Sequence, residues 1–567
     1  MRKLFFLVLF SNFYFLVFSF VFADTLGQTA TFNIDSEYEY SGQAKVSATL
    51  RKVSDKAYWY VSDEYWNGVS AAEQSSFSSE LDELASEFDT RIYPTEVFFW
   101  GSEWNPGIDN DPRITVLLTR LIDKAGGYYD TSHQYKKNQA PESNEREMVF
   151  INTSGVLSGR AKTFLAHEFQ HLIDFNQKDR LNGLSEEIWL NEIRSEYSVK
   201  LTGYDADFEN SNLRRRTIAF LQSPSEPLGE WKNLSPDYGA ITLFVHYLTD
   251  HYGDKILVDS LKMPSIGIES INQALRLNGF SETFSDVFAD WTIANALNDP
   301  SVDPRFAYRS EDLKSLKVAP AQNFVVSGFG TNISVFNTVK DWQPVWYDFN
   351  TPIGNDGNLR VDFSGSAGSR FVVPYIVFHI NGKKDIGLMD LTDNGGTTFI
   401  ERFGSDVHKV VIIPANHSKT SGFGDNDPES SFNFNARVVS EVPIPTPSPT
   451  PSPSVSATPA TQSIQTILDQ IRFLEEQITG LQNRPAVSQT VPFALARDLF
   501  TGSTGEDVRR LQDFLTGEGV YPEAKVTGYF GSLTRSAVIR FQKKYGIFPQ
   551  IGYVGAKTRS KINELGQ

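Results

Sequence analysis

Five consecutive residues, His167-Glu168-Phe169-Gln170-His171, place a carboxylate between two side chains that bind metal ions. Two histidines four positions apart share one face of an α-helix, about one turn apart, so both imidazoles can reach a single ion. The surrounding residues 163–175 carry apolar side chains at helical spacing, with no proline or glycine, and this predicts a buried helix with or without a metal. An isolated histidine there would be an ordinary core residue, but the paired spacing predicts a zinc site.

A catalytic zinc ion usually takes three protein ligands and leaves a fourth position for water. Glu192 is the candidate for the third ligand, because it lies in a second helical pattern, residues 185–201, with Ser185 as the candidate N-cap. Glu168 is rotated by about 100° from His167, toward the expected water, and should act as general base. Glu196, one turn beyond Glu192, should accept the outer N–H of a zinc histidine.

The two segments HEFQH and WLNEIRSE resemble the HExxH plus NExxSD pattern of the thermolysin-like metallopeptidases, and more closely that of the hyicolysin-like secreted bacterial peptidases. The similarity runs from about residue 60 to about residue 300, through FDTRIYP, PGIDNDPRITVLL and SNEREMVFIN. It implies an α+β zincin domain with His167, His171 and Glu192 as zinc ligands. One position departs from the pattern: Glu196 stands where the family has Asp, which puts its contact with the histidine in doubt.

The resemblance implies two further parts of an active site. A strand just before the zinc helix binds substrate as an added β-strand in such peptidases, and residues 145–152 have the composition for it. An ordinary core strand is the alternative. Tyr238 is the candidate donor to the developing oxyanion, because related enzymes carry a Tyr or His at the head of a helix downstream of the Glu ligand. His246 and His251 lie in the apolar pattern of that helix and are expected to be structural.

The composition limits the chemistry and the partners. The chain has 567 residues, a formal net charge of −17 and no basic stripe, so we expect several domains and no nucleic-acid partner. It has no cysteine, which excludes disulfides, thiol catalysis and zinc-thiolate sites. Calcium is a second candidate ion for an exported protein without disulfides, with Asp109, Asn110, Asp111 and Asp123 as candidate oxygen ligands. A solvated turn is the preferred alternative for the first three.

The N-terminal part predicts export. Arg2 and Lys3 precede an apolar run over residues 4–22 and a small residue, Ala23, which is typical of a signal peptide over residues 1–23. An uncleaved membrane anchor is the alternative, because the run is long. Residues 24–55 are expected to form an N-terminal β segment or a pro-region. Residues 56–312 would form the zinc metallopeptidase domain, with its sheet before its helices.

The following segments predict a β domain and a spacer. Residues 313–440 contain short β-branched runs between Gly, Asn and Asp, which favours an antiparallel β-sandwich accessory domain. Residues 441–462 are rich in Pro, Ser and Thr and should form an extended linker. Residues 463–484 place Ile and Leu at positions a and d of three heptads between 464 and 481, which predicts either a weakly self-associating coiled coil or a monomeric amphipathic helix.

The last segment, residues 495–567, resembles the small all-α peptidoglycan-binding domain of bacterial wall enzymes. The resemblance rests on GSTGEDVRRLQDFL, GYFGSLTRSAVIRFQKKYGI and GYVGAKTRSKIN, in which Gly531 to Thr534 and Gly555 to Thr558 form an internal repeat. Each repeat is expected to be a turn that enters a helix. The expected core residues are Val508, Leu511, Leu515, Val538, Ile539 and Phe541.

The sequence therefore predicts a multidomain, secreted and cell-wall-associated zinc endopeptidase that hydrolyses protein or peptide substrates through zinc-activated water. Its other partner would be peptidoglycan, bound by the C-terminal module. A peptidoglycan peptide hydrolase is the alternative within enzymes. A non-catalytic wall adhesin is the alternative from another class, although a binding protein has no need of the general base Glu168.

Overall fold

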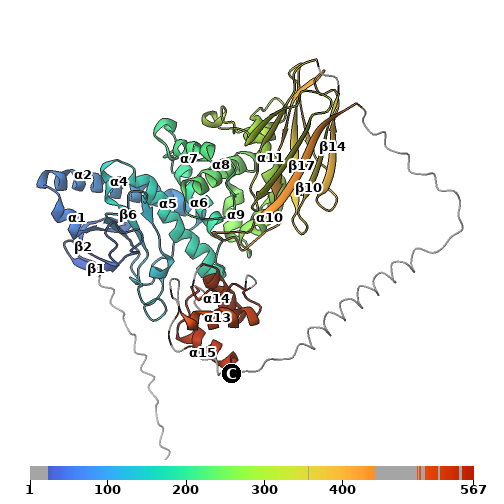
Figure 1. Ribbon diagram of the computed structural model, residues 1–567. Helices are drawn as coiled ribbons and strands as arrows, with labels where there is room; N and C mark the ends of the chain where they lie inside the picture. Colours follow the sequence, from blue (N-terminus) through green and yellow to red (C-terminus); the bar gives the residue numbers. More distant parts are fainter. Residues whose placement is uncertain are drawn as a thin grey trace, which may run out of the picture.

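The computed structural model describes residues 23–354, 357–440 and, with short gaps, 495–566. Figure 1 shows three parts in chain order: a sheet followed by helices, a two-sheet unit (residues 322–440) and a C-terminal helical unit. The predicted signal peptide, the Pro-rich linker and the heptad segment lie almost wholly outside the described residues. Within the described ranges, no helix has the length and apolar character needed to cross a bilayer.

The first part begins with a six-stranded sheet of order β1-β2-β3-β4-β6-β5. Strands β3, β4 and β6 run parallel, and the other neighbouring pairs are antiparallel. The strands are β1 (Thr29–Asn33), β2 (Lys45–Val53), β3 (Ala57–Ser62), β4 (Ile114–Thr119), β5 (Gly127–Tyr128) and β6 (Met148–Asn152). Residues 29–53, expected as a β segment or pro-region, thus supply two strands of this sheet.

The central strands are buried on both faces, because helices cover one face and an aromatic cluster covers the other. Every residue of β3, β4 and β6 is buried, as the continuous apolar runs of parallel strands require. Alternate residues divide between two cores: Trp59, Val116 and Ile151 join the helices, whereas Tyr60 and Phe150 join the opposite cluster.

The helices of the first part fall into two groups. Around the sheet lie α1 (Asp63–Gly68), α2 (Ala71–Glu87), α3 (Tyr93–Trp100) and α4 (Thr153–Leu157). The helical half contains α5 (Ala161–Asp174), α6 (Ile188–Leu201), α7 (Asn212–Gln222), α8 (Ser235–Tyr252), α9 (Lys255–Lys262), α10 (Gly267–Leu277) and α11 (Phe284–Leu297). The single-turn segments Phe88–Ile92 and Phe175–Arg180 are π-helical.

Helix α6 starts later than the sequence pattern predicts. Ser185 is not its N-cap, because the helix begins at Ile188 with Glu187 in the cap position. The two preceding carboxylates are used elsewhere: Glu186 binds the buried guanidinium of Arg194 at 2.9 Å, and Glu187 accepts from the Trp189 indole at 2.7 Å. The start of α6 is therefore fixed by tertiary contacts and not by a serine cap.

In the two-sheet unit, two mostly antiparallel sheets pack around one hydrophobic core. One sheet has the order β14-β10-β17-β8 and the other β13-β12-β15-β9-β7, with β11 and β16 as a separate pair. The strands are β7 (Gln322–Val325), β8 (Asn332–Val339), β9 (Tyr347–Asn350), β10 (Asn358–Gly365), β11 (Phe371–Val372), β12 (Pro374–His379), β13 (Lys384–Leu388), β14 (Gly395–Ile400), β15 (Val407–Ile412), β16 (Ala415–Asn416) and β17 (Ser430–Val439).

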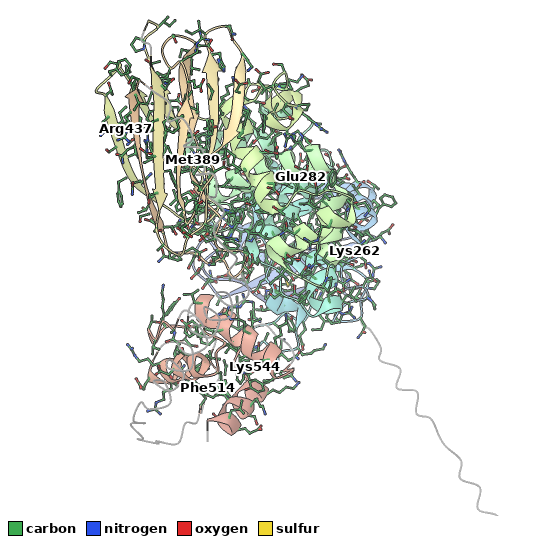
Figure 2. The ribbon with its side chains drawn as sticks, turned by 90° about the vertical axis from the view of Figure 1, so that its right-hand side faces the viewer. Lys262, Glu282, Met389, Arg437, Phe514 and Lys544 are labelled. Carbon is green, nitrogen blue, oxygen red and sulfur yellow. The ribbon has the colours of Figure 1, made fainter. Side chains whose placement is uncertain are left out.

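The C-terminal unit contains α13 (Glu506–Gly517), α14 (Ser532–Lys544) and α15 (Ala556–Leu565). Figure 2 labels it at Phe514 and Lys544. The sequence repeat has a structural counterpart. Buried Gln512 donates to the Thr534 hydroxyl at 2.8 Å, and buried Gln542 donates to the Thr558 hydroxyl at 3.0 Å.

Five of the six expected core residues of this unit lie in its hydrophobic cluster. Ile539 is the exception, because it is only partly buried.

Candidate metal centre

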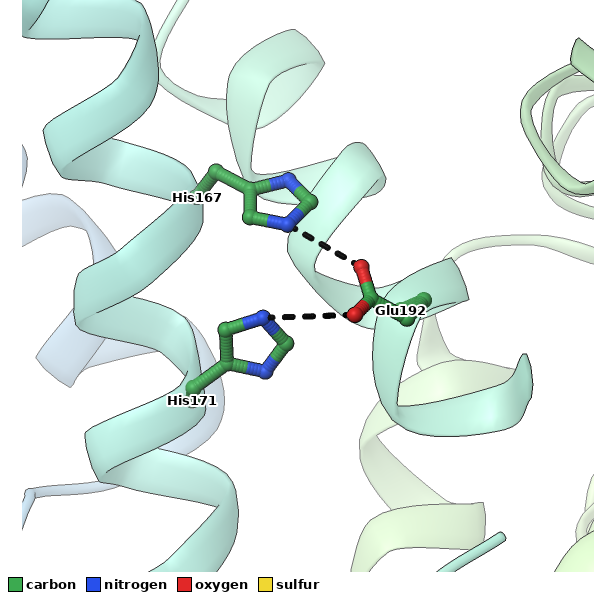
Figure 3. Close-up of side chains that lie close together, drawn as sticks. All are labelled: His167, His171 and Glu192. Carbon is green, nitrogen blue, oxygen red and sulfur yellow. Dashed lines mark hydrogen bonds and ion pairs between the residues drawn. The ribbon is translucent and has the colours of Figure 1, made fainter. Parts of the chain in front are cut away.

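Helices α5 and α6 bring the three predicted metal ligands together. One ligand atom from each of His167, His171 and Glu192 lies within 4.8 Å of the others. The Nε2 atom of His167 is 3.1 Å from Glu192 Oε2, and that of His171 is 3.9 Å from Glu192 Oε1 (Figure 3). Two imidazole nitrogens and a carboxylate thus converge from two neighbouring helices, which is a donor set that suits zinc.

Polar side chains contact the outer nitrogen, Nδ1, of each histidine. Nδ1 of His167 lies 3.4 Å from Glu196 Oε1. Nδ1 of His171 lies 2.7 Å from Asn191 Oδ1 and 3.1 Å from the Ser195 hydroxyl. Because carboxylate and amide oxygens only accept hydrogen bonds, each Nδ1 carries a hydrogen, and Nε2 is the nitrogen of each ring that faces Glu192.

Glu196 is itself anchored, despite the departure from the family's Asp. Arg216 donates to both of its carboxylate oxygens, at 3.0 and 2.6 Å, while Asn212 and Thr242 each donate to Oε2 at 2.8 Å. Burial alone would raise its pKa, but Arg216 and His167 hold the pKa of Glu196 well below its ordinary value. The carboxylate is therefore charged and fixed beside His167.

The charges of the centre favour a cation between the ligands. Burial alone would lower the pKa of His167, but hydrogen bonds to Glu192 and Glu196 raise it to about 10. Burial lowers the pKa of His171 to about 4, so this ring is neutral at neutral pH. The field that stabilises a proton on His167 would also stabilise a divalent ion.

Glu168 lies on the same helix, beside the ligand group. Its residue is 7% exposed, and its Oε2 is 4.0 Å from Nε2 of His171. Burial raises its pKa to about 8; the nearby His167 opposes this rise, and the carboxylates of Glu192 and Glu196 add to it. Desolvation of a carboxylate in this way increases its basicity.

The free edge of the sheet beside Glu168 belongs to β5 and not to the predicted strand. β6 lies between β4 and β5 and is wholly buried, so residues 148–152 form an ordinary core strand, which was the alternative, and offer no edge to an added substrate strand. In the antiparallel pair, Asn152 N donates to Gly126 O at 2.9 Å, and Gly127 pairs with Ile151. Hydrogen-bonded pairs alternate along such a ladder, so the N–H and C=O of Gly127 point away from β6.

Tyr238 lies in the first turn of α8 and near the ligand group. Its ring centroid is 6.3 Å from that of His167, and the Arg216 guanidinium lies 4.1 Å from its ring. Its hydroxyl donates to Asn233 Oδ1 at 2.9 Å. Burial raises its pKa well above the ordinary value, so the phenol keeps its hydrogen.

The two other histidines of α8 lie apart from the ligand group. His246 is buried, and neither ring nitrogen has a hydrogen-bond partner within the described part of the chain. Burial lowers its pKa to about 3. His251 contacts the Ala307 carbonyl through Nε2 at 2.9 Å. The burial of His246 and the carbonyl contact of His251 fit the structural roles expected from the sequence.

Several residues of the centre are missing from the sequence-based prediction. Asn191 adjoins Glu192 in the same motif and could have been found from that position. Arg216 lies in a run of three arginines that looks like a solvated face. Gly127 comes from a sheet segment far away in the sequence, and no local pattern marks it.

The candidate calcium ligands hold a turn in this structure. Asp109 Oδ1 accepts from Asp111 N at 2.9 Å, and Asp111 Oδ2 accepts from the Tyr58 hydroxyl at 2.7 Å. Asp111 is buried, so this turn is less solvated than expected. Calcium binding stays a prediction.

A groove of about 760 Å³ lies elsewhere, between α11 and the β12–β13 hairpin. Glu282, labelled in Figure 2, and Asp290 line one side, and Lys384 and Leu388 line the other. It contains no residue of the His167, His171 and Glu192 group. The groove therefore marks the junction with the two-sheet unit and is separate from the candidate metal centre.

Comparison with known proteins adds likenesses to parts of the chain. Residues 504–562 match the family model described as "Putative peptidoglycan binding domain". The chain is 25% identical over 219 residues to the neutral metalloprotease ShpI of Staphylococcus hyicus, covering 34% of this chain and 47% of that protein. It thus spans about half the length of this curated relative.

Two solved structures are similar to short segments. The SleB N-terminal domain is 36% identical, with 13% of this chain and 100% of that chain covered and a TM-score of 0.13. The pre-peptidase C-terminal domain of a collagenase from Bacillus anthracis is 11% identical, with 21% and 97% covered and a TM-score of 0.15. Neither likeness carries an argument at these TM-scores. The chain is therefore a distant relative of a neutral metalloprotease and carries a domain that matches a peptidoglycan-binding family.

Proposed function

We propose that the protein is an exported zinc-dependent endopeptidase of the thermolysin-like class that hydrolyses protein substrates and is held at the cell wall by its C-terminal domain. The observation that carries the proposal is the convergence of two imidazole Nε2 atoms and the Glu192 carboxylate beside the buried Glu168. The partial likeness to a neutral metalloprotease supports it.

His167, His171 and Glu192 would hold the ion, with Glu196 and Asn191 fixing the two rings through their Nδ1 atoms. A bound zinc ion supplies Lewis acidity, which lowers the pKa of a water molecule toward neutrality and polarises a carbonyl group. Glu168 would accept the proton of that water and pass it to the leaving amine nitrogen.

The free edge of β5 would align the substrate. An extended peptide can add to this edge through the N–H and C=O of Gly127, next to Glu168. Tyr238 would serve as a donor to the developing oxyanion. To do so, its hydroxyl must exchange the hydrogen bond to Asn233 for one to the substrate.

The C-terminal match to a peptidoglycan-binding family also supports a second candidate, a hydrolase of the peptide cross-links in peptidoglycan. A protein-cleaving site is the better candidate, because WLNEIRSE resembles the Glu-ligand helix of protein-cleaving enzymes. A non-catalytic adhesin is less well supported, because Glu168 lies beside the group of His167, His171 and Glu192, and a binding protein has no need of a general base.

Cleavage of casein and cleavage of purified peptidoglycan distinguish these candidates. We expect the protein to cleave casein, to lose this activity when a chelator removes the metal, and to regain it with about one zinc ion per chain. Cleavage of purified peptidoglycan without cleavage of casein would replace the proposal with the second candidate. A zinc-loaded protein that cleaves neither would contradict both enzymatic candidates.

A further inference from the structure

Tyr38 lies in the turn between β1 and β2 and borders the edge strand β5. Its ring stacks on Tyr128 of β5, with centroids 4.8 Å apart and planes 17° apart. Tyr128 in turn stacks on Phe150 at 4.3 Å, and the Tyr38 carbonyl accepts from Ile122 N at 2.9 Å. The sheet therefore holds this tyrosine rigidly beside the strand proposed to align the substrate.

Asn233 connects Tyr38 to the helical half. Its amide nitrogen donates to the Tyr38 hydroxyl at 2.7 Å, across 195 positions of sequence. Its amide oxygen accepts from the Tyr238 hydroxyl at 2.9 Å. Asn233 has a φ of 59°, a conformation that asparagine tolerates well. Asp237 accepts from the backbone N–H groups on either side, those of Lys232 and Leu234, and so fixes the turn.

The direction of these two bonds distinguishes the tyrosines. A phenol has one hydrogen to donate. Tyr238 gives its hydrogen to Asn233, whereas Tyr38 accepts from Asn233 and donates to no acceptor within the described ranges. Burial, followed by the charges of Glu168, Asp35 and Glu192, raises the pKa of Tyr38 to about 12, so the phenol keeps its hydrogen at neutral pH.

The position of this hydrogen suits a peptide group. Tyr38 stacks on Tyr128 of the edge strand. Through Asn233 it is also linked to Tyr238, whose ring centroid lies 6.3 Å from that of His167. A peptide added to the free edge of β5 would lie beside the strand on which Tyr38 stacks. Its backbone carbonyls are the acceptors that such a donor would find.

We propose that Tyr38 is a substrate-contacting residue whose hydroxyl donates a hydrogen bond to a backbone carbonyl of a peptide lying along β5, and that Asn233 positions this hydroxyl. The inference rests on the proposed peptidase function and adds a residue that no motif of the sequence marks. The Tyr238 hydroxyl, the Asn233 amide and the Tyr38 hydroxyl form one hydrogen-bonded chain. The Asn233 amide therefore polarises the Tyr38 phenol.

The test compares Tyr38→Phe with Tyr40→Phe. The first variant loses the hydroxyl but keeps the stacking on Tyr128. The second removes a hydroxyl from the same turn that bonds Glu64, away from β5. For a casein-derived peptide, we expect Tyr38→Phe to raise KM about five- to tenfold, as the loss of one neutral hydrogen bond does, with kcat and zinc content unchanged. Tyr40→Phe should match the wild type.

Asn233→Gly removes the positioning amide without straining a positive φ. It should raise KM at least as much as Tyr38→Phe, and the double variant should have the KM of Asn233→Gly alone, because the two residues act as one unit. Additive increases in KM would contradict the positioning role. An unchanged KM in Tyr38→Phe would overturn the inference.

A binding measurement separates this inference from the proposed function. A fluorescein-labelled casein peptide is titrated into Glu168→Gln protein, with and without Tyr38→Phe or Tyr40→Phe. We expect Tyr38→Phe alone to weaken binding about five- to tenfold. If the wild type cleaves no peptide and this difference persists, the substrate contact stands and the peptidase proposal fails. If all three proteins bind equally, the contact is refuted whatever the activity.

Discussion

At the scale of single residues, the candidate metal centre depends on side chains outside the group of His167, His171 and Glu192. Glu196 receives four hydrogen bonds from Arg216, Asn212 and Thr242, and it stands behind His167. Asn191 contacts Nδ1 of His171 in the same way. Such contacts orient the rings before a metal binds, which reduces the cost of assembling the site.

Gly127 gives a test of the contact between β5 and Glu168. A Cβ atom at this position would lie 2.8 Å from Phe150 O and 3.1 Å from Glu168 Cγ. Gly127→Ala must therefore shift β5 or Glu168, and we expect kcat/KM to fall on the order of a hundredfold with zinc retained. Gly68→Ala is the matched control, because nothing lies within 4 Å of its Cβ. Full activity of Gly127→Ala would refute the proposed role of this edge.

Glu147 should make stability depend on pH. Burial raises its pKa to about 8, although a hydrogen bond from Ile108 N opposes the rise. The folded protein binds this proton more tightly than the unfolded chain, whose carboxyl has an ordinary pKa of 4.5. The stabilisation is thus complete below about pH 4.5, and the free energy of unfolding falls as the pH rises to about 8.

The variant Glu147→Gln stays neutral and should remove this fall. Denaturant unfolding at about pH 5 and about pH 8 measures it: the variant should gain stability over the wild type at the higher pH. Glu142→Gln is the control, because Glu142 is an exposed side chain of the same loop. Parallel changes in the wild type and in Glu147→Gln would show that Glu147 does not titrate as stated.

At the scale of elements, the sequence predicts the two helices of the centre well and the edge strand poorly. Both α5 and α6 have long apolar periodicities, which local sequence reveals. β5 has two residues, Gly127 and Tyr128, too few for any alternation, and only its pairing with β6 defines it. The start of α6 was missed for a different reason, because Glu186, just before the helix, forms ion pairs with Lys178 and Arg194 that helix-capping patterns do not reveal.

Arg194 tests how these ion pairs hold α6. Its guanidinium donates to Asp174 at 2.8 Å, to Glu186 at 2.9 Å and to the Ser260 hydroxyl at 3.1 Å, and all these side chains are buried. Arg194→Ala leaves the buried carboxylate of Asp174 without its ion-pair partner and leaves Glu186 with Lys178 at 3.6 Å, so we expect a loss of about 3–5 kcal/mol in unfolding free energy. Calorimetry or denaturant unfolding measures it.

Arg214→Ala provides the comparison for this variant, because Arg214, which lies on α7, forms an exposed ion pair with Glu209. Exposed pairs of this kind contribute little, so its stability should stay near that of the wild type. Equal stability of the Arg194→Ala and Arg214→Ala proteins would mean that the buried network does not hold α6.

At the scale of the whole molecule, the two-sheet unit shares a hydrophobic core with the helical half. Trp342 packs against Phe284 and Phe288, with ring centroids 4.8 and 5.2 Å apart. Gly422 N donates at 2.6 Å to Glu187, the residue in the N-cap position of α6. The sequence predicts a separate accessory domain, because composition reveals a change of strand pattern but not a shared core.

Two truncations test this arrangement. A chain that ends at about residue 441 keeps both cores, so it should cleave casein but no longer sediment with purified sacculi. A chain that ends at about residue 312 exposes the apolar surface under Trp342 and should be insoluble or unfolded. Sedimentation of the longer truncated protein with sacculi would show that the C-terminal domain is not the principal anchor.

The central claim is that His167, His171 and Glu192 bind the zinc ion and that Glu168 performs the chemistry without binding it. Zinc content and casein hydrolysis, measured together on Glu168→Gln and Glu192→Ala, test it most directly. We predict that Glu168→Gln retains about one zinc ion per chain and has no activity, whereas Glu192→Ala loses zinc and activity together. Full activity of Glu168→Gln, or equal loss of metal from both variants, would contradict the account.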